Sequence, residues 1–190
     1  MMDKEQLFNE LLQPVELQMV SKLIGIVESN EINIKDIFQI SLNTNKQAAF
    51  RAAWMLEYLM LNKPQDFIYH LSNLFDALSQ VKNQSVIRHY TKMISLLTSK
   101  KVNPIYIIPI ASIDFNPVVE LFFSWLLDEK TLVASKVHCM QTLANLNLRF
   151  KWIGTELLQT IDYLEPKESI AFFARAKVIK KTLLKQSQNA

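Results

Sequence analysis

Glycine is nearly missing from this sequence, which has only 2 among its 190 residues, Gly25 and Gly154. Sheet proteins use glycine in hairpin turns and bulges, where φ is often positive. Parallel α/β folds also place glycines at the turns between strands and helices. The scarcity of glycine therefore argues against both classes and favours helices joined by short turns. Two isolated glycines also cannot form a phosphate-binding glycine loop.

Cysteine and long apolar runs are scarce as well. The single cysteine, Cys139, cannot form a disulfide within the chain, which makes a reducing compartment the simplest expectation. The longest apolar stretches cover residues 105–111, interrupted by Pro109, and residues 121–127. Both are well below the roughly 18 residues that a membrane span needs. Since the N-terminus is polar and shows no targeting signal, we expect a cytoplasmic protein without a membrane partner.

The remaining composition is that of an ordinary folded protein, with 49% hydrophobic and 21% charged residues. The length predicts a single domain over residues 1–190. The formal net charge is +3, which neither requires nor excludes a nucleic-acid partner.

Apolar residues recur at helical spacing between prolines and clusters of Asn, Asp and Ser. This pattern predicts helices over residues 3–13, 15–28, 33–42, 46–61, 64–80, 83–99, 116–127, 131–146, 152–164 and 166–185. Pro14, Pro64 and Pro166 are expected in the first turns of their helices, where proline is tolerated. Residues 100–115 contain two prolines and predict an irregular insertion, a packed loop with at most one short turn. A strand is the alternative there.

A local pattern repeats in four of these helices. A basic residue near the helix start is followed by small or apolar residues, and the four basic residues are Arg51, Arg88, Lys136 and Arg175. They recur after 37, 48 and 39 positions, close to the roughly 40–47 residues of a repeated helix pair. One such pair cannot bury its apolar face alone, so neighbouring pairs must stack. The sequence predicts an all-α fold, a right-handed α-α superhelix of four to five antiparallel helix pairs.

The segments RAAWMLE at 51–57, KVHCMQTL at 136–143, WI at 152–153 and ARAK at 174–177 resemble HEAT-like, armadillo-type helical repeats. The resemblance covers about residues 45–185. More narrowly, it extends to a group of small bacterial HEAT-like proteins of the Bacteroidetes type. In HEAT-type repeats a polar turn residue pairs with a basic residue of the adjacent repeat, which implies such a role for the four basic residues here.

Members of that bacterial group are often labelled adenylosuccinate lyase. This chain lacks the serine-rich loop containing Met-Pro that the enzyme uses, and it is too short for the enzyme's helical core. The residues therefore do not support that activity.

Few residues suggest catalytic chemistry. The three histidines, His70, His89 and His138, lie on different predicted helices and lack the paired spacing of zinc ligands. Cys139 lies in the middle of an apolar helix face, which is typical of a structural cysteine rather than a reactive one. We therefore expect no metal, no cofactor and no catalytic residue that the sequence can name.

Trp54 and Glu57 stand three residues apart and are predicted to share one helix face. The repeat architecture is similar to that of the HEAT-like DNA alkylation repair glycosylases. In that family an aromatic residue and a carboxylate on the concave face act at a damaged base. The alternative is core packing for Trp54 and a solvated or arginine-paired Glu57.

The four basic residues have two interpretations. If they are exposed along one face, they would contact the phosphates of a nucleic acid. If they are hydrogen-bonded within the fold, they would link adjacent repeats. The candidate residues for a ligand face or inter-repeat contacts are Arg51, Trp54, Glu57, Arg88, Lys136 and Arg175.

The leading functional hypothesis is a non-catalytic interaction module that binds a protein or peptide on its concave face. Nucleic-acid binding, in a glycosylase-like manner, is the first alternative, and a small enzyme of unknown chemistry is the second. Protein binding predicts an exposed apolar or aromatic patch. Nucleic-acid binding predicts four exposed basic residues, and an enzyme predicts a pocket of convergent titratable groups.

Overall fold

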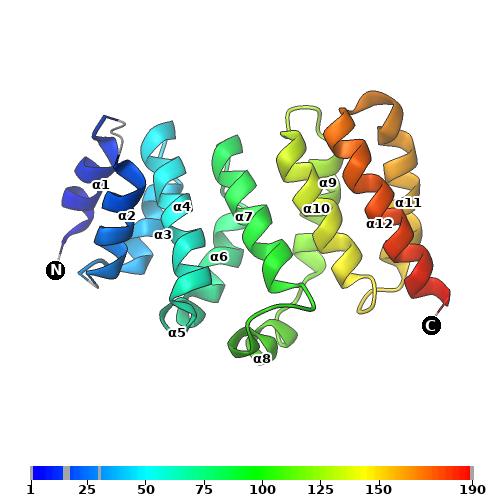
Figure 1. Ribbon diagram of the computed structural model, residues 1–190, viewed down its shortest axis with the longest axis horizontal. Coiled ribbons are helices and arrows are strands. Elements are labelled where there is room, and N and C mark those ends of the chain that lie inside the picture. Colours follow the sequence, from blue (N-terminus) through cyan, green and yellow to red (C-terminus); the bar gives the residue numbers. More distant parts are fainter. Residues whose placement is uncertain (1, 15–17, 30, 189–190) are drawn as a thin grey trace. The chain divides into compact units, whose positions relative to one another are not determined.

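A computed structural model describes residues 2–14, 18–29 and 31–188, and every regular element in these ranges is helical (Figure 1). The helices are α1 (Lys4–Leu12), α2 (Met19–Glu28), α3 (Ile34–Ser41), α4 (Lys46–Asn62), α5 (Pro64–Phe67), α6 (Leu71–Leu78), α7 (Gln84–Leu97), α8 (Ile107–Ala111), α9 (Asn116–Leu127), α10 (Val133–Leu146), α11 (Trp152–Leu164) and α12 (Ile170–Gln188). Three 3₁₀ turns supplement them: η1 (Ile68–His70), η2 (Pro104–Tyr106) and η3 (Glu165–Lys167). The predicted all-α class is confirmed.

Short polar side chains start several helices where the sequence predicts them. Asp3 and Gln6 form a reciprocal capping box at the start of α1. The side chain of Asn33 accepts a hydrogen bond from the backbone of α3, and that of Asn45 accepts two from the backbone of α4. These side chains satisfy backbone N–H groups that the first turn of a helix leaves without a partner.

Three predicted helices differ from the observed ones. The described part of the 15–28 helix begins at Met19, and the predicted residues 15–17 and Asn30 lie outside the described residues. The 64–80 helix was predicted as continuous, but η1 interrupts it. Pro166 lies in η3 rather than at the start of the last helix, because Glu168 is extended and α12 restarts at Ile170.

The prediction of a packed loop over residues 100–115 is wrong. Asn103 caps η2, whose first turn accepts Pro104, and the chain continues directly into α8. Much of the segment is also exposed, with Ile107 at 54% and Ile108 at 83%, while Tyr106 is buried. No single described helix is long and apolar enough to cross a membrane, although the bent pair of Pro104–Ala111 and Asn116–Leu127 meets that test by length and composition.

Residues 1–90 form the first of two compact units, with α4 at its centre. Helices α1, α2 and α3 all pack against α4. They approach closely because one side of α4 carries alanines, and Ala48, Ala49, Ala52 and Ala53 are completely buried. The buried hydroxyl groups of Ser41 and Tyr90 share a hydrogen bond within the same unit.

Residues 91–190 form the second compact unit, in which α10 packs against α9, α11 and α12. Its core includes Phe122, Met140, Leu143 and Phe172, all without exposure. The chain thus divides into two compact units, each described here by itself. The single domain predicted over residues 1–190 stays a prediction.

Gly154, in the first turn of α11, has a defined packing role. A Cβ atom at this position would lie 2.6 Å from Oδ1 of Asn147. The Asn147 side chain cannot simply swing away, because it is buried and its Nδ2 donates a hydrogen bond to Oε1 of Gln186 at 2.8 Å. Gly25, in contrast, has nothing within 4 Å of its added Cβ atom.

We therefore predict opposite effects of the same substitution at the two glycines. Gly25→Ala should raise the free energy of unfolding by about 0.5–1 kcal/mol, the usual advantage of alanine within a helix. Gly154→Ala should lower it, because displacing Asn147 breaks the bond to Gln186. Urea unfolding followed by circular dichroism checks both variants, and equal stabilisation would contradict the packing role of Gly154.

Candidate interaction surfaces

A row of aromatic side chains runs along the exposed side of α4. Phe50, Trp54 and Tyr58 follow one another at a spacing of four residues, and Leu61 extends the row. Phe50 is 40% exposed and Leu61 is 50% exposed, while Trp54 and Tyr58 are half-buried. The rings of Trp54 and Tyr58 stack with their centroids 5.7 Å apart. These four residues are called the aromatic row below.

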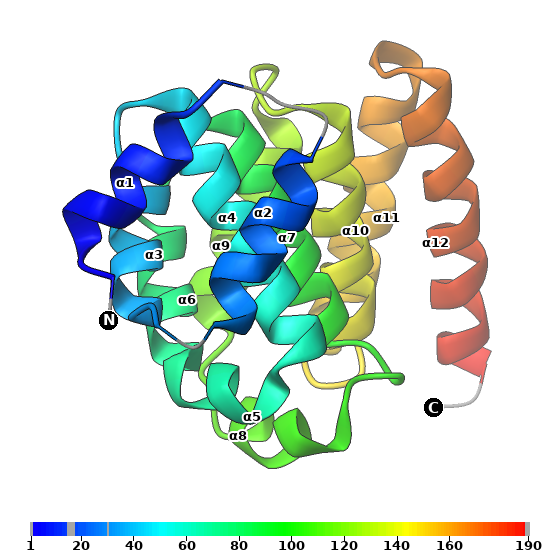
Figure 2. The same cartoon turned by 60° about the vertical axis from the view of Figure 1, so that its left-hand side comes forward.

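One end of the aromatic row is tied to α2, which lies beside α4 (Figure 2). The Tyr58 hydroxyl donates a hydrogen bond to Oε1 of Glu28 at 3.2 Å. Oε2 of the same carboxylate forms an ion pair with Lys63 at 3.3 Å. Desolvation and the Glu28 carboxylate raise the pKa of Tyr58, so its hydroxyl stays protonated and remains a donor. The bond to Glu28 thus restrains the Tyr58 ring of the stacked pair.

A carboxylate–imidazole pair lies beneath the aromatic row. Oε2 of Glu57 is 2.7 Å from Nδ1 of His89, and both residues are only 8% exposed. The Phe50 ring lies beside the imidazole, with 5.3 Å between the ring centroids. Nε2 of His89 is buried and has no hydrogen-bond partner among the described residues. Glu57 therefore faces inward, whereas Trp54, three residues earlier, stays half-exposed.

We expect Glu57 and His89 to be strongly coupled in stability. Replacing either by alanine should cost about 3 kcal/mol, because it breaks a buried carboxylate–imidazole contact. The double variant should cost clearly less than the two single effects added together. Urea unfolding of the four proteins measures this coupling, and simple additivity would show that the pair is unimportant to the fold.

The four predicted basic residues do not form one exposed row. Arg51 is 4% exposed, and its Nη1 donates to the backbone carbonyl oxygens of Leu11 at 2.8 Å and Gln13 at 2.6 Å, at the end of α1. Lys136 is 2% exposed and forms an ion pair with Oε1 of Glu168 at 2.6 Å, just before α12. Both cations thus link their helix to another helix of the same unit.

The other two basic residues are on the surface. Arg88 is exposed, and Arg175 is exposed with one hydrogen bond of 3.3 Å to Oε1 of Gln141. The four basic residues, called the basic ladder below, therefore divide into two buried links between helices and two surface cations. Arg88 and Arg175 are the two of these four residues that are exposed to solvent.

Substitution of the ladder residues should separate these two groups. Lys136→Met should lower the free energy of unfolding by about 3 kcal/mol, because it leaves the mostly buried Glu168 carboxylate without its cation. Arg175→Met, the matched control, should change it by less than about 0.5 kcal/mol, since the lost hydrogen bond is exposed. Thermal unfolding of both variants provides the measurement, and a similar loss in the two would contradict a structural role specific to Lys136.

Charge is distributed unevenly between the two units. Residues 1–90 carry 8 Lys and Arg and 10 Asp and Glu, whereas residues 91–190 carry 13 and 8. The formal charges are therefore −2 and +5. All acidic residues of the second unit lie within 114–129 and 156–168, on α9, α11 and their turns, so α10 and α12 carry none.

The remaining candidates offer little reactive chemistry. Cys139 is buried, and burial raises the pKa of its thiol well above the usual value, which keeps it protonated. Among the described residues, no group of three or more His, Cys, Asp or Glu side chains is placed to hold a metal ion.

Sequence reasoning named Trp54 but missed its neighbours. The i, i+4, i+8 spacing of Phe50, Trp54 and Tyr58 was a readable signal for a shared helix face. The partnership of Glu57 and His89 was not readable, because the residues lie on different helices and no local spacing relates them.

A comparison with protein-family models matches residues 7–185 to the HEAT repeat domain. The chain belongs to the HEAT repeat family. The predicted resemblance to HEAT-like repeats is confirmed, and the protein is a helical-repeat scaffold. No curated protein and no solved structure matches it.

Proposed function

We propose that this HEAT repeat protein is a non-catalytic interaction module that binds a peptide segment of a protein partner along the aromatic row. One observation carries the proposal: beyond its first turn, α4 offers solvent only the aromatic row and Asn62. A helix that presents apolar rings where charged residues are usual is typical of a binding surface.

The aromatic row suits a peptide for energetic reasons. Stacked and partly buried rings bind with large contact areas and lose little conformational freedom. Phe50 and Tyr58 are separated by about 12 Å along the helix axis at 1.5 Å per residue. That length corresponds to about two turns of a second helix, so an amphipathic helix with apolar residues at i, i+4 and i+7 matches the row.

The alternative functions have less support at this surface. Nucleic-acid binding through the basic ladder is weakened because Arg51 and Lys136 already bond to their own chain. A glycosylase-like site would need a carboxylate on the surface beside Trp54. Glu57 instead is buried and bonded to His89.

Selection of peptides from a displayed library against the intact protein tests the proposal. Selected peptides should carry apolar residues at helical spacing and bind with micromolar Kd. Trp54→Ala and Phe50→Ala should each weaken binding roughly tenfold or more, as loss of a central aromatic contact does.

Tyr69→Ala is the matched control, because Tyr69 is an aromatic residue of the same unit that is 83% exposed and lies outside the row. Peptide affinity should be unchanged in this variant. Failure to enrich peptides, or equal loss in all three variants, would overturn the proposed function. Circular dichroism confirms beforehand that each variant is folded.

A further inference from the structure

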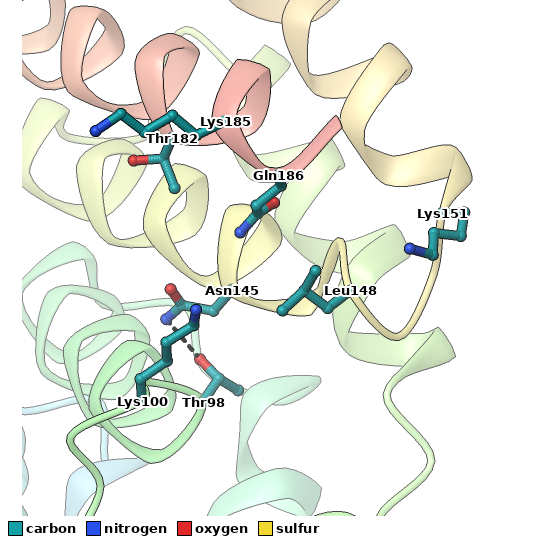
Figure 3. Close-up of a pocket in the computed structure, with 8 residues that line it drawn as sticks. All are labelled: Thr98, Lys100, Asn145, Leu148, Lys151, Thr182, Lys185 and Gln186. Atoms are coloured by element: carbon teal, nitrogen blue, oxygen red, sulfur yellow. Dashed lines mark hydrogen bonds between the residues drawn. The ribbon is translucent and has the colours of Figure 1, made fainter. Parts of the chain in front are cut away.

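The second unit contains a pocket of about 620 Å³ between the ends of α7, α10 and α12 (Figure 3). Three lysines from different segments line it: Lys100 after α7, Lys151 before α11, and Lys185 in the last turn of α12. Among the described residues that line it, none is acidic. Figure 3 shows Lys100 and Lys151 on opposite sides of the pocket.

The three ammonium groups are not used within the fold. In the part of the chain that the structure describes, none of them forms an ion pair or a side-chain hydrogen bond, and all three lysines are exposed. Lys180, on the same helix as Lys185, shows the contrast, because it pairs with both Asp162 and Glu165. The pocket therefore gathers positive charge that no described side chain of this unit neutralises.

The polar wall between the lysines is fixed by its own hydrogen bonds. Asn145 donates to the carbonyl of Ser95 and to the hydroxyl of Thr98, both at 3.2 Å, and accepts from Gln141 at 2.9 Å. Thr98 in turn donates to the carbonyl of Ile94. These donors are already occupied, so the lysines are the groups left to recognise a ligand, and they recognise negative charge rather than a pattern of donors and acceptors.

The surroundings reinforce the selection for anions. The acidic residues of this unit lie on α9, α11 and their turns, while the pocket is built mainly by the ends of α7, α10 and α12. A concave site whose charged lining residues are all lysines raises the local concentration of anions. Its volume falls in the range of sites for small molecules and cofactors.

From this geometry we infer that the pocket binds a small polyanion that carries several phosphate groups, of about the size of a nucleotide. Ammonium groups on opposite sides of the pocket suit a ligand with several separated negative charges better than a single phosphate. Lysine binds phosphate as a point charge, and a chain of phosphates places several charges along one small molecule. The site lies entirely within the second unit and does not depend on the aromatic row.

Isothermal titration of the intact protein with inorganic triphosphate, at low salt, tests this inference. We expect one binding site per chain. Changing Lys100, Lys151 and Lys185 together to glutamine should weaken binding at least roughly tenfold, because the charge-assisted contacts are lost. ATP should bind at the same site, and its binding should be weakened by the same triple substitution.

A charge-matched control separates the pocket from the general positive charge of this unit. Changing Lys130, Lys177 and Lys181 to glutamine removes the same charge from exposed lysines that do not line the pocket. Triphosphate affinity should change less than about twofold in this control. An equal loss in the two triple variants, or no binding by the original protein, would overturn the inference.

Two further probes address the nature of the ligand. Citrate, which carries three carboxylates, should bind more weakly than triphosphate; equal or tighter binding would overturn the assignment to phosphate. A single-stranded oligonucleotide should bind no more tightly than triphosphate. Much tighter binding, weakened equally by both triple substitutions, would indicate an extended nucleic-acid surface instead of a pocket.

Discussion

The rest of this structure depends on two buried cations, Arg51 near the start of α4 and Lys136 near the start of α10. Arg51 holds the beginning of α4 against the carbonyl end of α1, and Lys136 holds the beginning of α10 against the turn before α12. Each brings a charge out of water, which is tolerable only because an acceptor lies within hydrogen-bond distance. These links fix where neighbouring helices begin relative to one another. They also remove two cations from the surface, so what the surface can bind is decided by other residues.

The two units also differ in what their surfaces present. In residues 1–90 the exposed side of α4 is apolar, and the net charge is slightly negative. In residues 91–190, α12 exposes lysines beside apolar side chains such as Phe173 and Val178, and the acidic residues are confined to α9, α11 and their turns. A repeated backbone thus presents two kinds of chemistry, because the repeat constrains the buried positions and leaves the exposed ones to vary. Helical-repeat architecture alone would not have revealed this division.

Most of the fold was predictable because helix signals are local. Asp3, Asn33 and Asn45 cap the helices expected of them, and the basic residues recur at the length of a helix pair. The break at Ile68–His70 was not predictable, since no proline or glycine marks it. The prediction of a loop over residues 100–115 failed because the prolines were taken to interrupt helical structure. Here Pro104 and Pro109 lie within short helical turns.

The candidate site was predictable only where residues share a helix, as Trp54 and Tyr58 do. Contacts between helices, such as Glu57 with His89 or the convergence of Lys100, Lys151 and Lys185, depend on tertiary packing that local spacing does not encode.

The glycine at position 154 leaves room for Asn147, and Asn147 connects the start of α11 to the end of α12. Asn147 occupies the space that a Cβ atom would need, and from there it holds Gln186 against the lysine-lined pocket. Positions 147, 154 and 186 are therefore structurally coupled: a side chain at 154 would displace Asn147, and Gln186 would then lose the hydrogen bond from Asn147. A substitution at Gly154 would therefore disturb Gln186 in the pocket wall without any change to the three lysines.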